Sequence, residues 1–202
     1  MGNAGTGRIR EHRKRNVQQK IYDCAIDLFI EKGFENVKIS DICKAAQVST
    51  GTFYYYYPSK ESIFFNYANA IDDLVESEFP KLKAATCEET LRNLIMFKFN
   101  ASIQAGPAVN NVSWTAELKH NKDVAMDLRR VAYGYYMNTI EAGIRNGEFR
   151  QDINLYSATS LIRYAIGGLI LHWSIQGEEM DVNSEAERIV DLIITLLKPP
   201  RE

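Results

Sequence analysis

Apolar residues recur along most of the chain at intervals of three and four positions, without sustained alternation of apolar and polar residues. This spacing collects apolar side chains on one face of an α-helix, whereas a half-buried strand needs a period of two. The five prolines stand at the edges of the periodic segments. The pattern predicts an all-α protein with helices at about 16–32, 40–46, 50–57, 60–80, 88–105, 108–119, 122–146, 155–176 and 184–198.

Polar residues mark where two short helices begin and end. Ser40 is a suitable N-cap for the helix at 40–46, and Asp41 matches the positive end of the helix dipole. Ser49 or Thr50 can cap the next helix, which Pro58 ends. We therefore expect two short helices joined by a tight turn.

The second short helix contains an aromatic run from Phe53 to Tyr57. Its composition is typical of a strand, but its caps and neighbours predict a helix. On a helix, Phe53 and Tyr57 share the inner face, and Tyr56 lies near the edge. Tyr54 and Tyr55 then point outward. An aromatic cluster is commonly core, yet consecutive helical positions cannot all be buried because they point in different directions.

Two short helices that follow a longer one are typical of a helix-turn-helix. Ala45 and Ala46 are small enough for close approach, and Ile42, Val48 and Phe53 can fill the space between the helices. The N-terminus of a recognition helix meets base edges, and its hydroxyl groups and dipole bind phosphate. The pattern predicts DNA binding through the aromatic helix.

The charge distribution supports this prediction, although the net charge of the 202 residues is −2. Residues 1–62 hold ten Lys and Arg against seven Asp and Glu, whereas the remainder holds fourteen against nineteen. A basic first third followed by an acidic remainder indicates that only the N-terminal part meets a polyanion.

Residues 33–54, followed by Tyr56-Tyr57 and Ser59-Lys60-Glu61, resemble the DNA-binding domain of the TetR family of transcriptional regulators. The resemblance covers about residues 14–74 without gaps. It implies an all-helical homodimeric repressor that binds a palindromic double-stranded DNA operator and releases it when a small-molecule effector binds. The positions that match the family's DNA contacts are Ser49, Thr50, Thr52, Tyr54, Tyr55, Tyr56 and Lys60.

Two of these aromatic positions depart from the family's usual residues. Tyr56 stands where His is frequent, which removes a titratable contact but keeps a hydroxyl donor. Tyr57 stands where Phe is usual, so a hydroxyl at a core position needs a partner or must reach the surface.

The resemblance implies a basic flexible arm at 1–13, a helix-turn-helix domain at 14–74 and a ligand-binding and dimerisation domain at 75–202. Cations of the N-terminal segment could contact the minor groove or phosphates, and a solvated tail is the alternative. These cations are Arg8, Arg10, Arg13, Lys14 and Arg15.

The last two expected helices are too apolar for one buried face each, which predicts a dimerisation pair. Ordinary monomer core is the alternative, but two recognition helices one turn of DNA apart need a dimer. The apolar residues are Ile162, Ala165, Ile166, Gly167, Leu169, Ile170, Ile189, Val190, Ile193, Ile194, Leu196 and Leu197.

Aromatic and soft residues of the C-terminal helices predict an apolar ligand pocket, although each is equally an ordinary core residue. No cluster of charge stands out among them, so a lipophilic or aromatic ligand is favoured. They are Phe97, Trp114, Tyr133, Tyr136, Met137, Tyr164 and Trp173.

An enzyme needs a constellation of reactive groups, and the sequence indicates none. Glu117-x-x-His120 matches half of a di-iron motif, but no second Glu-x-x-His exists. We expect no catalytic residue, metal or cofactor, and a cytoplasmic protein without a membrane partner. The serious alternative is a helical small-molecule-binding module without DNA activity.

Overall fold

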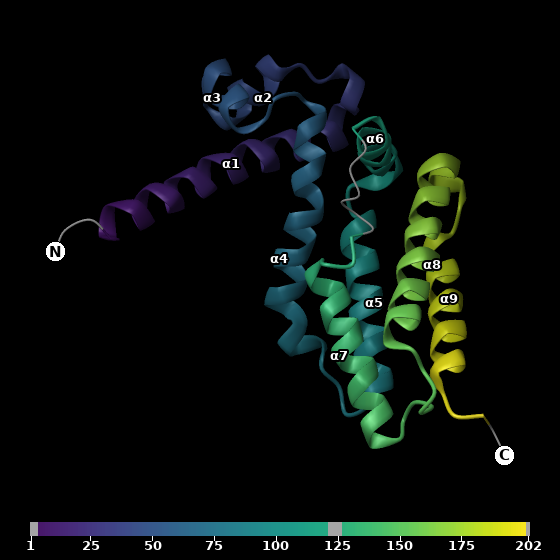
Figure 1. Ribbon diagram of the computed structural model, residues 1–202. Coiled ribbons are helices and arrows are strands. Elements are labelled where there is room, and N and C mark those ends of the chain that lie inside the picture. The colour runs from purple at the N-terminus through teal and green to yellow at the C-terminus, as the bar shows by residue number, and fades with distance from the viewer. Residues whose placement is uncertain (1–3, 121–126, 201–202) are drawn as a thin grey trace. The chain divides into compact units, whose positions relative to one another are not determined.

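The computed structural model describes residues 4–120 and 127–200, with side chains from Asn16 onward except at positions 65–68 and 178. The described residues form α-helices and short 3-10 turns, and no strand occurs among them (Figure 1). The predicted all-α class is confirmed. The chain divides into two compact units, Met1–Asn66 and Tyr67–Glu202. This boundary falls within one helix, ahead of the expected domain limit after residue 74.

The first unit contains α1 (Ala4–Lys32), α2 (Ile39–Ala46) and α3 (Thr50–Tyr56), with 3-10 turns at Phe34–Asn36 and Glu61–Ile63. α1 begins well before the expected start near residue 16. α2 is preceded by Lys38 rather than Ser40 as its N-cap residue. The reason is that the Lys38 backbone N–H donates to the Asp41 carboxylate (2.9 Å), as in the second half of a capping box.

The second unit contains most of α4 (Phe64–Leu82) and the helices α5 (Cys87–Ile103), α6 (Gly106–Lys119), α7 (Val131–Asn146), α8 (Leu155–Gln176) and α9 (Val182–Leu197). The helix expected from residue 122 begins only at Val131. The Asp127 carboxylate accepts the Arg129 backbone N–H (2.9 Å), which organises a turn ahead of α7. Residues 122–126 of that expected helix lie outside the described part.

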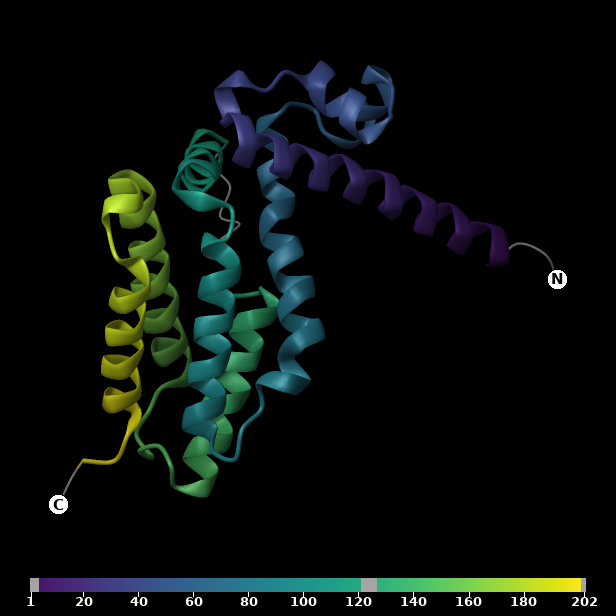
Figure 2. The same ribbon diagram turned by 180° about the vertical axis from the view of Figure 1, so that it is seen from behind.

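Helix α5 lies in the interior of the second unit and packs against α7, α8 and α9 (Figure 2). α6 crosses the end of the bundle at which α5 ends. Its position is fixed by Asn110, whose side-chain amide donates to the carbonyls of Ser102 and Gly106 (3.0 Å each). The core between these helices is apolar and includes Leu91, Leu94, Phe99, Ile140, Phe149 and Val190.

At Gly143 the backbone of α7 lies very close to a neighbouring aromatic ring. A Cβ atom there would lie 2.2 Å from Cδ2 of the buried Phe149 ring, whereas at Gly134 on the same helix it would meet nothing within 4 Å. We expect Gly143→Ala to destabilise the protein by about 1–3 kcal/mol, because the packed ring must move. Gly134→Ala should instead stabilise it by about 0.5–1 kcal/mol. Urea unfolding followed by circular dichroism checks this pair, and equal midpoints would contradict it.

Candidate functional site

Helix α3 begins at a side-chain cap. The Ser49 hydroxyl accepts the Thr52 backbone N–H (3.0 Å), and the hydroxyl groups of the two residues lie 2.8 Å apart. In the preceding turn Gln47 has the left-handed conformation (φ 55°), and the Val48 N–H donates to the Cys43 carbonyl (3.0 Å). The cap and the turn predicted from the sequence are therefore formed, and α2 and α3 make a helix-turn-helix.

Two residues of the aromatic run hold α3 to its unit. Phe53 and Tyr57 are 0% and 1% exposed. The Tyr57 hydroxyl donates to the Gln18 carbonyl of α1 (3.2 Å), so the partner expected for this buried hydroxyl is confirmed. Ala46 is buried as expected, but Ala45 is exposed and does not bring the helices together.

The other aromatic residues face solvent. Tyr54 is 51% and Tyr55 65% exposed, whereas Tyr56 is half-buried and its ring lies 4.9 Å from that of Tyr55, edge to face. Ser49 and Thr50 are exposed at the start of the helix. α3 therefore presents hydroxyl groups and aromatic faces from a well-anchored backbone. DNA contacts at these positions stay predictions.

Lys60 has internal partners that the sequence did not indicate. Its ammonium group donates to the carbonyls of Phe34 (2.6 Å) and Val37 (2.9 Å) and lies 4.0 Å from the centre of the Phe34 ring. Two of its three donors are thus committed within the unit. A phosphate contact by Lys60 stays a prediction, and Lys60→Ala would also loosen the unit.

The basic residues of the N-terminal arm cannot be placed against DNA. The side chains of Arg8, Arg10, Arg13, Lys14 and Arg15 lie outside the described part of the chain. Their contact with the minor groove or phosphates therefore stays a prediction.

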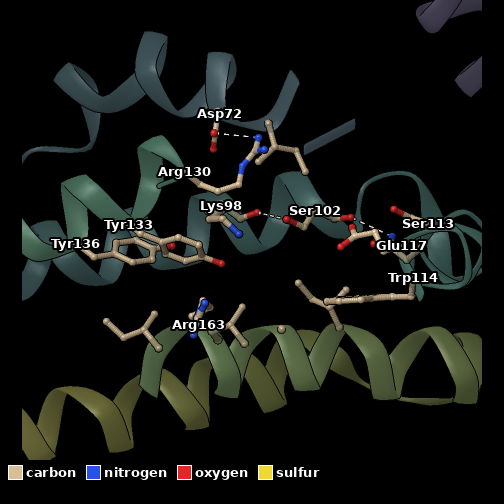
Figure 3. Close-up of a pocket in the computed structure, with 16 residues that line it drawn as sticks. Asp72, Lys98, Ser102, Ser113, Trp114, Glu117, Arg130, Tyr133, Tyr136 and Arg163 are labelled. Atoms are coloured by element: carbon tan, nitrogen blue, oxygen red, sulfur yellow. Dashed lines mark hydrogen bonds and ion pairs between the residues drawn. The ribbon is translucent and has the colours of Figure 1, made fainter. Parts of the chain in front are cut away.

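A pocket in the second unit is bounded by α4, α5, α6, α7 and α8 (Figure 3). The space between its atoms is about 730 Å³, counting the part open to solvent. Its walls are aliphatic and aromatic over much of their area, as is common for small-molecule sites. The apolar walls are formed by Ile71, Trp114, Tyr133, Tyr136, Ile162, Ile166 and Ile170.

Three of the seven residues predicted to line a pocket do so, namely Trp114, Tyr133 and Tyr136. Trp173 is buried in the core, and Phe97 is half-buried and packs against this core. The structure places the remaining two, Met137 and Tyr164, outside the pocket lining. Tyr164 is 59% exposed, because it lies on the outer face of α8.

The pocket also contains buried charge. The Arg130 guanidinium, just before α7, forms an ion pair with the Asp72 carboxylate of α4 (2.9 Å). Arg130 also donates to the Asn69 side chain (3.1 Å), and Asp72 accepts the Val131 backbone N–H (3.2 Å). A carboxylate at the start of α7 is favoured by the helix dipole. The pair thus joins α4 to α7 at the edge of the pocket.

Lys98 of α5 is the third cation of this region, with Arg130 and Arg163. Its ammonium group lies 5.3 Å from the centre of the Tyr133 ring. Burial lowers the pKa of Lys98 to about 8, and the Asp72 carboxylate partly opposes this shift. In Figure 3 the ends of Lys98 and Arg163 point toward the same space. Burial also holds the pKa of Tyr136 well above its usual range.

Helices α8 and α9 lie side by side at the edge of the second unit (Figure 2). Both helices expose apolar side chains. Most residues expected at a dimer face are instead buried within the chain, and only Leu196 among them is exposed. The exposed stripe on α8 repeats at intervals of three and four, the spacing of packed helix pairs. It comprises Leu161, Tyr164, Gly168, Leu171 and Ile175, and on α9 Leu192 and Leu196.

Comparison with known families identifies both units. Residues 21–67 match the family described as bacterial regulatory proteins, tetR family, and residues 110–199 match the C-terminal region of MAATS-type transcriptional repressors. The chain belongs to the TetR family. This is a family of DNA-binding transcriptional regulators rather than of enzymes. None of the described helices has the length and apolar character needed to cross a bilayer.

Individual proteins are similar to this chain over nearly its whole length. The fatty acid metabolism regulator protein of Bacillus subtilis is 24% identical over 189 residues, which cover 90% of this chain and 96% of that protein. The crystal structure of FadR from Bacillus subtilis in complex with stearoyl-CoA has a TM-score of 0.68 at 21% identity, covering 89% and 98% of the two chains. Thermus thermophilus FadR in complex with lauroyl-CoA has a TM-score of 0.66 at 21% identity, covering 92% and 97%.

Sequence reasoning missed the charged residues of the pocket. Asp72, Lys98, Glu117 and Arg163 lie on four different helices, and Arg130 precedes a fifth, so no local spacing connects them. Two of them do carry a local signal. Lys98 interrupts an apolar run on α5, and Arg163 lies among the apolar positions of α8.

Proposed function

We propose that the chain is a cytoplasmic, homodimeric repressor that binds a palindromic operator through α3 and releases it when a small molecule enters the second-unit pocket. The observation that carries this proposal is the construction of α3. Phe53 and Tyr57 fix its inner face, while Tyr54 and Tyr55 are left exposed next to a capped N-terminus. Hydroxyl groups and helix N-termini are typical phosphate ligands, and the start of a recognition helix meets base edges.

The exposed stripes on α8 and α9 support the homodimer. Large apolar patches on a soluble protein mark interaction surfaces, and a two-fold dimer covers the same patch on both copies. Stripes spaced by three and four can interdigitate with those of a second copy in a four-helix arrangement. Such a dimer would supply the two recognition helices that a palindromic operator requires.

The pocket supports an acyl compound as the effector. Its isoleucine and aromatic walls suit a hydrocarbon chain. Two relatives of the same fold are bound to stearoyl-CoA and lauroyl-CoA, respectively. We therefore place the effector of this chain among fatty acids and their CoA thioesters.

Helix α4 offers a route for coupling the two events. Its Ile71 and Asp72 line the pocket, and the same helix begins with Phe64, which is buried in the core of the first unit. A ligand that changes the surroundings of Asp72 would favour one placement of α4 over another. A difference in affinity between two such states is sufficient to shift the DNA-bound population.

Selection from a pool of random double-stranded DNA tests the DNA-binding part of this proposal. We expect the full-length protein to enrich a palindrome whose half-sites lie about one helical turn apart, with affinity that falls steeply as salt increases. Recovery of unselected sequences, without salt dependence, would contradict it. That result would favour a helical ligand-binding module.

A further inference from the structure

The charged groups that line the pocket do not balance. The residues around Lys98 that carry charge or can titrate are Asp72, Glu117, Arg130, Tyr133, Tyr136 and Arg163. Asp72 and Arg130 form an ion pair, and the other charged groups of the lining are Glu117, Arg163 and Lys98. The lining therefore holds one cation more than it holds carboxylates. No hydrogen bond of the Lys98 ammonium group to a described residue is seen. Its nearest assigned contact is the Tyr133 ring.

The neighbouring ion pair of Asp72 and Arg130 also has polar atoms without a hydrogen-bond partner among the described residues. The buried Asp72 Oδ1 and Arg130 Nη2 atoms have no hydrogen-bond partner among the described residues, although Nη2 lies 2.9 Å from Asp72 Oδ2. A buried polar group without a partner is costly, and a buried cation without an anion is more so. A ligand with an anionic oxygen pair would supply acceptors to Arg130 Nη2 and to the Lys98 ammonium group, whereas Asp72 Oδ1 is itself an acceptor and gains no donor from it.

We infer that this end of the pocket binds a carboxylate of the effector, with Lys98 as the residue that distinguishes acidic from neutral apolar ligands. The inference rests on the proposed function and narrows the effector from acyl compounds in general to those with a free acid group. The hydrocarbon chain would lie along the isoleucine and aromatic walls, and the acid group would meet Lys98 and Arg130.

Asp72 does not prevent an anion from binding at this position. Its charge is matched by the Arg130 guanidinium, and its Oδ2 atom accepts the Val131 backbone N–H at the start of α7. Burial keeps the pKa of Lys98 near 8, so the group is mainly protonated at pH 7 and mainly neutral at pH 9. An acid group therefore meets a cation at neutral pH.

Binding of laurate and of its neutral isostere lauramide to the full-length protein tests the inference, with calorimetry as the measurement. In wild-type protein we expect laurate to bind at pH 7 about tenfold or more tightly than lauramide, since hydrogen bonds to charged groups are the stronger ones. The Lys98→Met variant should bind laurate no more tightly than lauramide, and its affinity for lauramide should equal that of the wild type. Lys98→Arg, which retains the charge, should restore the preference for laurate.

The pH dependence gives a second readout that a purely structural role would not produce. Laurate affinity of the wild type should fall about tenfold between pH 7 and pH 9, as Lys98 loses its proton, whereas Lys98→Arg should show no such fall. Urea unfolding of each variant shows whether it is folded. Equal binding of laurate by wild type and a folded Lys98→Met variant would overturn the inference.

Lauroyl-CoA separates this inference from the proposed function, because the thioester has no free carboxylate. If Lys98→Met weakens laurate and lauroyl-CoA equally, the contact is made by another group and the carboxylate assignment is wrong. Suppose that lauroyl-CoA releases the wild type and Lys98→Met from DNA at the same concentration, and that laurate binds neither of these two proteins. The carboxylate inference then fails and the proposed function stands. Failure of the wild type to bind the selected DNA would instead contradict the proposed function.

Discussion

Replacing Leu192 and Leu196 together with glutamate should convert the protein from a dimer to a monomer. Both side chains are exposed on α9, and in the proposed dimer they would lie close to the second copy. Four buried carboxylates would then replace four leucines, and burying unpaired charge is strongly unfavourable. Operator affinity should fall by at least about 100-fold, because a monomer engages only one half-site.

Light scattering after size-exclusion chromatography measures this effect directly. The wild type should have twice the 23.0 kDa mass of one chain, and the double variant should have the mass of one. Leu118→Glu is the matched control, because Leu118 is 78% exposed on α6 and belongs to neither stripe. It should remain a dimer. A monomeric wild type, or a double variant that is still dimeric, would contradict this interface.

Replacing Tyr54 and Tyr55 with glutamate should weaken operator binding on the order of 100-fold, since like charges brought together at an interface cost several kcal/mol. The fold should be unaffected because both side chains are exposed and the anchors Phe53 and Tyr57 are unchanged. Electrophoretic mobility shift with the selected palindrome measures the loss.

Tyr156→Glu is the matched control for that experiment. Tyr156 is 61% exposed on α8 in the second unit, so the same change of charge is made outside the helix-turn-helix. This variant should bind the operator as the wild type does. Equal operator binding by the Tyr54 and Tyr55 double variant would show that this face of α3 does not meet DNA.

The recognition helix was predictable because its information is local. Helix geometry over a few residues is enough to predict the cap at Ser49 and the shared inner face of Phe53 and Tyr57, four positions apart. It also predicts that Tyr54 and Tyr55 point outward. The structure agrees at each of these positions. The start of α7 was not predictable in the same way. The polar segment before Val131 is compatible with a helix in sequence. In the structure the Asp127 carboxylate accepts the Arg129 backbone N–H and stabilises a turn instead.

Tertiary contacts explain what the sequence did not reveal. Lys60 matches a DNA-contact position, but its ammonium group donates to the carbonyls of Phe34 and Val37. These two residues are far from Lys60 in sequence, so local sequence did not indicate the contacts. The pocket's charge arises in the same way, since Asp72 and Arg130 meet only through the packing of α4 near the start of α7. On α8 and α9, apolar content alone could not separate buried Ile166 from exposed Leu192.

In the proposed function, one chain couples binding of an acyl ligand to release of DNA. Fluorescence anisotropy of a labelled palindrome tests it most directly, with the full-length protein titrated with laurate and, separately, with lauroyl-CoA. We expect a saturable, salt-dependent rise in anisotropy when the protein is added, and loss of this rise when one of these ligands is added. Stable DNA binding that neither ligand changes, or no DNA binding at all, would contradict it.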